Sequence, residues 1–241
     1  MLSRAAELDA TSPVLKGFYK AGGVTVLITV LVPLAEMAIY YLPGVAQASQ
    51  RTVTVTDWFT LFQNNWFLGL RNLGLLNLIG ASLLTPTFLA MFFALRRQNE
   101  PWAALGTIFY FMGMAVYLAS NRSFAMLSLS GQYASAATDA QRSMLAAAGQ
   151  TMLVEGLNRM GIFLIDSAGL VISAVMLRSE GFGKAAYAGV LGNGLMIVFE
   201  VILAFVPAWR SAGLGIAVCG GLSIMTWYVL VGRRLLQLGS V

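Results

Sequence analysis

Three charged residues lie at helical spacing inside one long apolar stretch of the chain. The stretch 154–177 contains Glu155, Arg159 and Asp166, and at about 100° per residue their side chains fall within about 40° of one another on a helix. A charged side chain costs about 2.5 kcal/mol or more in hydrocarbon, so such a stripe is stable only where it faces protein or water. The spacing therefore predicts a polar stripe that faces the interior of a helical bundle.

Charged residues also interrupt other apolar stretches of the sequence. Glu36, Arg71 and Glu200 each lie a few residues inside one end of such a stretch. At about 1.5 Å per residue, these offsets place them roughly 0 to 10 Å below the outer surface of a bilayer. We therefore expect one intramembrane polar cluster, with each arginine within about 4 Å of a glutamate. The predicted members are Glu36, Arg71, Glu155, Arg159, Asp166 and Glu200.

Two interpretations of this predicted cluster remain open. It can be an ion-pair network that fixes how the helices pack and does nothing more. It can also line a polar pocket open to the outside, because ionisable groups inside membranes commonly mark ligand or ion pathways. Three glutamates accompany two arginines at the same predicted depth, so one acid is in surplus. Glu200 or Glu155 is the predicted surplus acid, where a cationic ligand or a titrating proton would be found.

The composition indicates what surrounds these charges. Of 241 residues, 58% are hydrophobic and 10% are charged, whereas about 25% of residues are charged in soluble proteins. The sequence predicts an all-α, polytopic membrane protein with a single domain over 1–241, a bundle of six transmembrane helices. A cleaved signal peptide is a weaker alternative for the first stretch, whose apolar core exceeds the usual 7 to 15 residues. The predicted spans are 22–42, 66–95, 101–120, 154–177, 185–206 and 212–231.

Shorter helices are predicted at the outer surface of the membrane. Thr56 is a candidate N-cap for a helix over 56–65, which carries interfacial aromatic residues. The connection 121–150 is predicted to contain a short surface helix, because Thr138 and Gln141 have the spacing of a capping box. Within the span 66–95, Pro86 is the predicted kink.

The basic residues predict the orientation of the chain in the membrane. Connections that would be cytoplasmic with both termini inside hold nine basic residues, and the opposite connections hold four. Cytoplasmic loops carry the excess of Lys and Arg, so both termini are predicted to be cytoplasmic. The nine are Arg4, Lys16, Lys20, Arg96, Arg97, Arg178, Lys184, Arg233 and Arg234, and the four are Arg51, Arg122, Arg142 and Arg210.

Several kinds of chemistry are disfavoured by the residues that the chain lacks. It has no histidine, and Cys219 is its only cysteine, so the usual ligands for haem and zinc are missing. No cofactor or metal is therefore predicted. Asp166 is the only aspartate in a predicted span, and the lysines lie at the predicted cytoplasmic ends, so we expect no enzyme. The net charge of +5 comes from basic residues scattered at segment ends, and no nucleic acid is expected as a partner.

Three blocks of small and apolar residues resemble a known family. These blocks are LSLSGQYASAATDAQRSMLAAAGQ over 127–150, VISAVMLRSEGFGKAAYAGVLGN over 171–193 and WYVLVGRRLLQLG over 227–239. They are similar to a family of bacterial six-span integral membrane proteins of unknown function, domain of unknown function 4386. The resemblance implies a protein of the bacterial inner membrane, and it transfers no activity and no site residues.

The function expected from these observations is that of a non-enzymatic ligand-binding or accessory membrane protein. A transporter of small solutes, or one coupled to protons through Asp166 or Glu200, is the alternative, and an intramembrane enzyme is less favoured. The expected partners are membrane lipid and a small-molecule or lipid ligand. Oligomeric state is not predicted.

Overall fold

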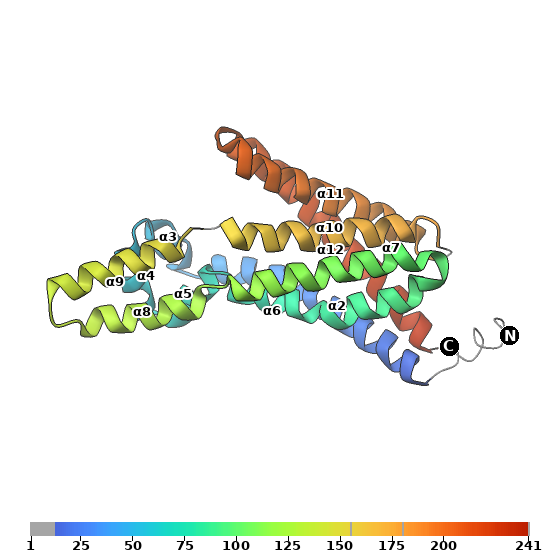
Figure 1. Ribbon diagram of the computed structural model, residues 1–241, viewed down its shortest axis with the longest axis horizontal. Coiled ribbons are helices and arrows are strands. Elements are labelled where there is room, and N and C mark those ends of the chain that lie inside the picture. Colours follow the sequence, from blue (N-terminus) through green and yellow to red (C-terminus); the bar gives the residue numbers. More distant parts are fainter. Residues whose placement is uncertain (1–12, 155, 180, 241) are drawn as a thin grey trace. The chain divides into compact units, whose positions relative to one another are not determined.

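The computed structural model describes residues 13–154, 156–179 and 181–240, and every regular element in these ranges is helical (Figure 1). Glu155, a predicted member of the cluster, lies outside the described residues. The chain divides into two compact units. The first unit comprises Met1–Leu31, Ala81–Ala115 and Arg159–Val241, and the second comprises Val32–Gly80 and Val116–Asn158.

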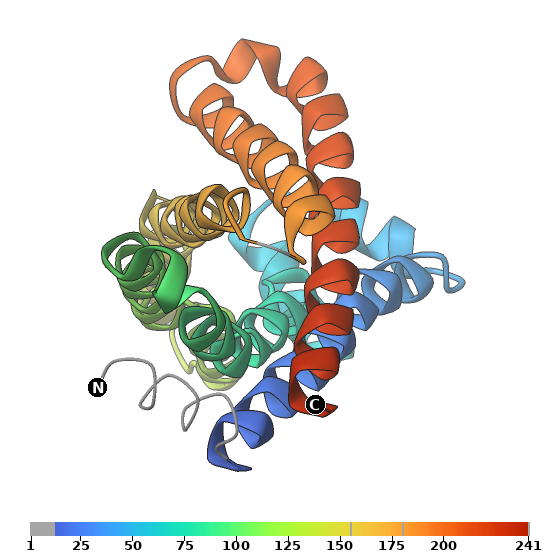
Figure 2. The ribbon, with the colours of Figure 1, turned by 90° about the vertical axis from the view of Figure 1, so that its right-hand side faces the viewer.

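Long helices make up the first unit. Helices α11 (Gly183–Phe205) and α12 (Arg210–Ser240) are joined by the short 3-10 helix η1 (Pro207–Trp209) and pack against each other along the unit, as Figures 1 and 2 show. Most of α10 (Gly156–Met176) and parts of α2 (Pro13–Tyr40) and α7 (Thr85–Ala119) complete the unit.

Helix α7 reverses direction at Asn99. This residue has φ −162° and ψ 87° inside the continuous helical assignment, so the chain is extended there and α7 consists of two arms (Figure 1). The rings of Phe88 and Tyr110, each eleven residues from Asn99, stack with centroids 4.1 Å apart. The Tyr110 hydroxyl also donates a hydrogen bond to the carbonyl oxygen of Ala81 at 2.6 Å. The two arms therefore run antiparallel. Pro101 fits the first turn of the second arm, where no backbone N–H is needed.

Glycine allows the second arm of α7 to approach α10 closely. A Cβ atom on Gly113 would lie 2.9 Å from the carbonyl oxygen of Gly161 and 2.9 Å from the backbone nitrogen of Ile165. Nearly two turns earlier, a Cβ on Gly106 would lie 2.8 Å from the Ile172 side chain. Backbones at this distance gain packing contacts that any larger residue would prevent.

Shorter helices make up most of the second unit. They are α3 (Val45–Arg51), α4 (Val55–Asn64), α5 (Trp66–Asn72), most of α6 (Leu75–Leu83), α8 (Ser123–Ser135) and α9 (Asp139–Met152), with the remaining parts of α2, α7 and α10.

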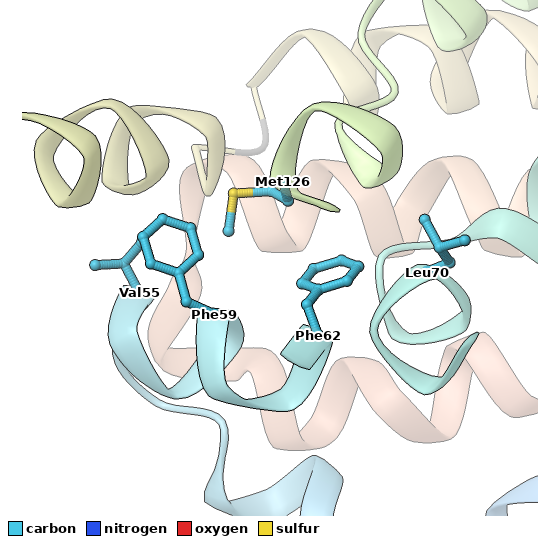
Figure 3. Packing of buried hydrophobic residues seen from close by; sticks show 5 residues of the cluster. All are labelled: Val55, Phe59, Phe62, Leu70 and Met126. Atoms are coloured by element: carbon cyan, nitrogen blue, oxygen red, sulfur yellow. The ribbon is translucent and has the colours of Figure 1, made fainter. Parts of the chain in front are cut away.

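The second unit has a compact hydrophobic core. Figure 3 shows Val55, Phe59 and Phe62 of α4 together with Leu70 of α5 and Met126 of α8, all of them buried. The ring of Phe59 also packs against Tyr133 of α8, with centroids 5.0 Å apart. Helices α4, α5 and α8 thus share one apolar cluster within the second unit, and Ala146 of α9 packs against it.

The structure corrects three details of the sequence predictions. The N-cap of α4 is Thr54 and not Thr56, because the Asp57 side chain accepts from the Thr54 backbone and closes a capping box there. The range 66–95 is not one helix: the chain breaks at Gly74, whose φ of 87° suits glycine, and again at Leu84. The second break lies two residues before Pro86, the predicted kink.

The connection 121–150 also differs from its prediction. It holds two helices, α8 and α9, where one short surface helix was predicted. The N-cap at Thr138 is confirmed, since its side chain accepts from the Gln141 backbone at 3.2 Å.

Within the described ranges, five helical stretches are long and apolar enough to cross a membrane. Many of their large apolar side chains are exposed, as on helices that face lipid. The protein is therefore an all-helical protein with the features of a multi-pass membrane protein. The five stretches are Pro13–Tyr40, Leu75–Ser135, Asp139–Met176, Gly183–Phe205 and Arg210–Ser240.

Candidate functional site

Polar residues on α10 and α11 face each other at intervals of seven. On α10 they are Arg159, Asp166 and Ser173, and on α11 they are Glu200 and Asn193. Seven residues are nearly two helical turns, so each set lies along one face of its helix. The helices run antiparallel, which brings Arg159 to the level of Glu200 and Asp166 to the level of Asn193. We call these five residues the polar column.

An ion pair lies at one end of the polar column. Arg159 Nη1 is 3.5 Å from Glu200 Oε2. The Glu200 side chain is 9% exposed and the Arg159 side chain is 29% exposed. A carboxylate this deeply buried is stable only with a charged or hydrogen-bonding partner, and Arg159 supplies one. Arg159, more exposed, keeps part of its contact with the surroundings of the protein.

Asp166 is the buried acid of the polar column. The residue is 7% exposed, and its Oδ2 atom is buried with no hydrogen-bond partner among the described residues. It lies close enough to Glu200 for the two carboxylates to repel each other. It is also close enough to Tyr228 of α12 for an electrostatic interaction. An ionised Asp166 would therefore have less stabilisation of its negative charge than Glu200 receives from Arg159.

A glycine of α10 makes room for the side chain of Asn193. The Asn193 Nδ2 atom donates to the carbonyl oxygen of Gly189 at 2.7 Å. The other side of the amide lies against Gly169 of α10, where any Cβ atom would overlap it. Asn193 is 3% exposed. The sequence thus places a buried amide where α10 and α11 are in contact, three residues along α10 from Asp166.

Two further polar groups lie at the other end of the polar column. The Ser173 Oγ atom and the Trp227 Nε1 atom of α12 are both buried and have no hydrogen-bond partner in the described ranges. Both lie next to Gly189, where a Cβ atom would meet them. Buried groups without partners are rare in proteins, and they occur at sites that hold water or a ligand.

A second ion pair lies in the second unit. Arg71 Nη2 is 2.7 Å from Glu36 Oε2 and donates to the Glu36 carbonyl oxygen at 2.7 Å. Arg71 Nη1 donates to Asn72 Oδ1 at 2.9 Å, and Asn72 Nδ2 donates to Ser49 Oγ at 3.0 Å. Arg71 is 8% exposed. Its charge is satisfied by a carboxylate, a carbonyl and an amide, so this pair connects α2, α3 and α5.

The structure pairs the two arginines of the predicted cluster with glutamates. The pairing of each arginine with a glutamate within about 4 Å is confirmed for Arg71 and Arg159. The structure places Arg71 and Glu36 in one unit and the polar column in the other, so a single cluster of all six residues stays a prediction. Glu200 pairs with Arg159, and because Glu155 lies outside the described residues, the choice of Glu200 or Glu155 as the surplus acid stays a prediction.

Among the described members of the predicted cluster, Asp166 is the acid for which the structure shows no ion pair with an arginine. Sequence reasoning also missed Ser173 and Asn193 as members of the site. The signal that could have identified them was the continuation of the seven-residue spacing along both helices.

The acidic residues do not gather into a metal-binding arrangement. Over 13–154, 156–179 and 181–240, no three residues of the His, Cys, Asp and Glu types lie close enough together to hold an ion. Cys219 is a free, exposed thiol on α12. The predicted absence of a metal or cofactor stays a prediction.

No protein-family model, curated protein or solved structure matches this chain. The class of the protein therefore rests on its own fold and site. It is an all-helical protein with five stretches able to cross a membrane among its described residues, and it has a buried polar column between two of its long helices.

Proposed function

We propose that this protein is a non-enzymatic, multi-pass protein of the bacterial inner membrane that binds a small cationic ligand beside Asp166. The observation that carries the proposal is the buried Asp166 carboxyl group, whose Oδ2 atom has no hydrogen-bond partner among the described residues. Ionisable groups buried in membrane helices commonly belong to ligand or ion pathways.

The balance of charge favours a cation as the ligand. The described residues of the polar column contain one base, Arg159, and two acids, Glu200 and Asp166. With Arg159 paired to Glu200, an ionised Asp166 would leave one uncompensated negative charge in a buried position. That charge is costly, and a bound proton or a cationic ligand would remove it. Asn193 and Ser173 offer neutral polar atoms on the same face for the rest of the ligand.

Binding without catalysis agrees with the residues available. The chain has no histidine, and the polar column contains no lysine or cysteine. The one hydroxyl, Ser173 Oγ, lies seven residues along α10 from Asp166, about 10 Å at 1.5 Å per residue. That separation is too large for Asp166 to act as its general base.

Mass spectrometry can test ligand binding directly. Native spectra of the purified protein should show a small bound species that is lost in Asp166→Asn. The control is Asp139→Asn, which removes a fully exposed carboxylate on α9 and should keep the species. Circular dichroism would establish that both variants are folded. Identical spectra for wild type and Asp166→Asn would contradict the proposal.

A proton-coupled transporter is the second candidate. The polar column favours it, because the spacing from Arg159 to Ser173 extends about 21 Å along α10, a large part of a bilayer core of about 30 Å. Proteoliposomes containing a pH-sensitive dye would distinguish the candidates. Proton flux that disappears in Asp166→Asn would favour the transporter, and a bound ligand without flux would favour the binding protein.

We further propose six crossings with both termini in the cytoplasm. The stretch Leu75–Ser135 is 61 residues long, far more than the roughly 20 residues that one crossing needs. The reversal at Asn99 supports two crossings within it. The nine to four distribution of basic residues supports the orientation, and the family resemblance supports the same count and the inner membrane.

Labelling of single cysteines tests this topology. Ser135→Cys on α8 and Gly183→Cys at the start of α11 would be placed in a chain carrying Cys219→Ser. Ser135 is exposed, and a Cβ on Gly183 meets nothing within 4 Å. An impermeant thiol reagent applied outside should label position 135 and spare position 183. Labelling of position 183 from outside would overturn the orientation.

A further inference from the structure

A basic pocket lies where α11 begins and α12 ends. Its volume is about 450 Å³, within the usual range for a small ligand. Three cationic side chains line it: Lys184 from α11 and Arg233 and Arg234 from α12. No acidic residue is among its described lining residues. The pocket belongs to the first unit alone and is separate from the polar column.

The beginning of α11 adds to the positive potential of this pocket. Helix α11 has 23 residues and starts at Gly183, and its N-cap Phe182 offers no side-chain hydrogen bond. The first N–H groups of a helix have no partner within the helix, and they carry the positive end of its dipole. Gly183 and Lys184 both line the pocket. Backbone donors and three side-chain cations therefore face the same space, an arrangement that binds phosphate groups.

Glycine at position 181 leaves space for the side chain of Arg234 in the pocket. Gly181 has φ 89°, and a Cβ atom there would lie 2.5 Å from Nη2 of Arg234. On its other side the guanidinium lies 5.9 Å from the centre of the Phe182 ring. Its Nη1 atom donates to Gln237 Oε1 at 3.5 Å, and its Nε atom is buried with no partner in the described ranges. Arg234 is thus positioned by its neighbours and has hydrogen-bonding capacity left.

We infer that this pocket binds the phosphate group of an anionic membrane lipid. Lys184 is the second residue of α11, and Arg233 and Arg234 follow the long apolar run of α12, so the pocket lies at the end of two membrane-spanning helices. That is the depth of lipid headgroups. One and two turns further along α11, Tyr187 and Leu191 are 72% and 56% exposed. They offer an apolar surface to the acyl chains of a lipid held by its phosphate.

Lipid binding to the full-length protein tests this inference. Native mass spectrometry would compare retention of phosphatidylglycerol and phosphatidylcholine, which have similar chains and differ in net charge. Wild type should retain phosphatidylglycerol preferentially, and Arg233→Gln combined with Arg234→Gln should weaken that binding about tenfold or more, because two charge-assisted contacts to the phosphate are lost. Arg210→Gln removes a charge from the opposite end of α12 and should change nothing.

Further measurements separate the outcomes. If the double variant does not fold, Lys184→Gln alone should still lower retention of phosphatidylglycerol. Inorganic phosphate at millimolar concentration is the second ligand to be tested. Phosphate binding without preference for the anionic lipid would overturn the lipid assignment. Equal retention of both lipids, or retention that Arg210→Gln lowers as much as the pocket variants do, would overturn the site.

Discussion

Replacement of Arg159 by methionine tests whether the ion pair of the polar column stabilises the fold. Methionine keeps an apolar stem of similar length and removes the guanidinium, so the change acts mainly on charge. It leaves Glu200, 9% exposed, without its arginine, and Asp166 nearby adds a second acid. We expect Arg159→Met to be strongly destabilising.

The size of the effect follows from distance and burial. Two unit charges 3.5 Å apart attract by about 5 kcal/mol at an effective dielectric constant of about 20. Arg159 is 29% exposed, which weakens the attraction, and removal of one member of a buried pair usually costs 3 to 5 kcal/mol. We therefore expect Arg159→Met to lower the free energy of unfolding by about 3 kcal/mol. Combining it with Glu200→Met removes the buried charge as well, and the double variant should lie within about 1 kcal/mol of wild type.

An exposed ion pair with nearly the same distance between its charged atoms provides the control. Arg142 on α9 is 3.6 Å from Asp139, but its side chain is 49% exposed and that of Asp139 is fully exposed. Arg142→Met should therefore cost less than about 1 kcal/mol. Unfolding in detergent, followed by the fluorescence of the five tryptophans, would compare these three variants with wild type. Equal losses for Arg159→Met and Arg142→Met, or a double variant as unstable as Arg159→Met, would refute the reasoning from burial.

Two other features of the fold give testable predictions. The pKa of Asp57 lies below its usual value because its carboxylate accepts hydrogen bonds from the backbone and hydroxyl of Thr54 and from the backbone of Val53. This stabilisation of α4 should be complete above the ordinary carboxyl pKa and lost as pH falls through the lowered pKa, so amide exchange in α4 should rise in acid for wild type but not for Asp57→Asn. Gly113→Ala should lower the free energy of unfolding by about 1 to 3 kcal/mol because its Cβ would press on the α10 backbone. Gly221→Ala, whose Cβ meets nothing within 4 Å, should not, and equal effects would contradict the packing argument.

The long helices could be predicted because hydropathy is summed over many residues. The predicted spans 154–177, 185–206 and 212–231 coincide with α10, α11 and α12. Their ends agree within a few residues, except that α12 continues to Ser240. The range 66–95 was predicted less well. Apolar content is high on both sides of Gly74 and Leu84, so composition gives no sign of the breaks there. A break depends on the backbone angles of one or two residues. Glycine at position 74 was a local signal for the first break, whereas Leu84 offered none for the second.

The ion pairs could be predicted in part for a similar reason. An arginine buried in an apolar stretch is costly unless it has a partner, so Arg71 and Arg159 were expected to be paired. This cost does not depend on how the helices pack. The identity of each partner depends on which helices are neighbours. Glu36 lies beside Arg71 and Glu200 beside Arg159, and no local pattern in the sequence could assign these pairs.

The polar column depends on the register of α10 against α11 more than on any single residue. Because both helices place polar residues at intervals of seven, a single antiparallel register aligns Arg159 with Glu200 and Asp166 with Asn193 together. Gly169 and Gly189 reinforce that register, since a Cβ atom at Gly169 would overlap the Asn193 amide and one at Gly189 would overlap the Ser173 hydroxyl. A shift of α11 by one turn, about 5 Å, would separate the ion pair and press the amide onto a side chain. Close packing at the two glycines therefore keeps Asp166 beside the ion pair, where a cation could replace its missing partner.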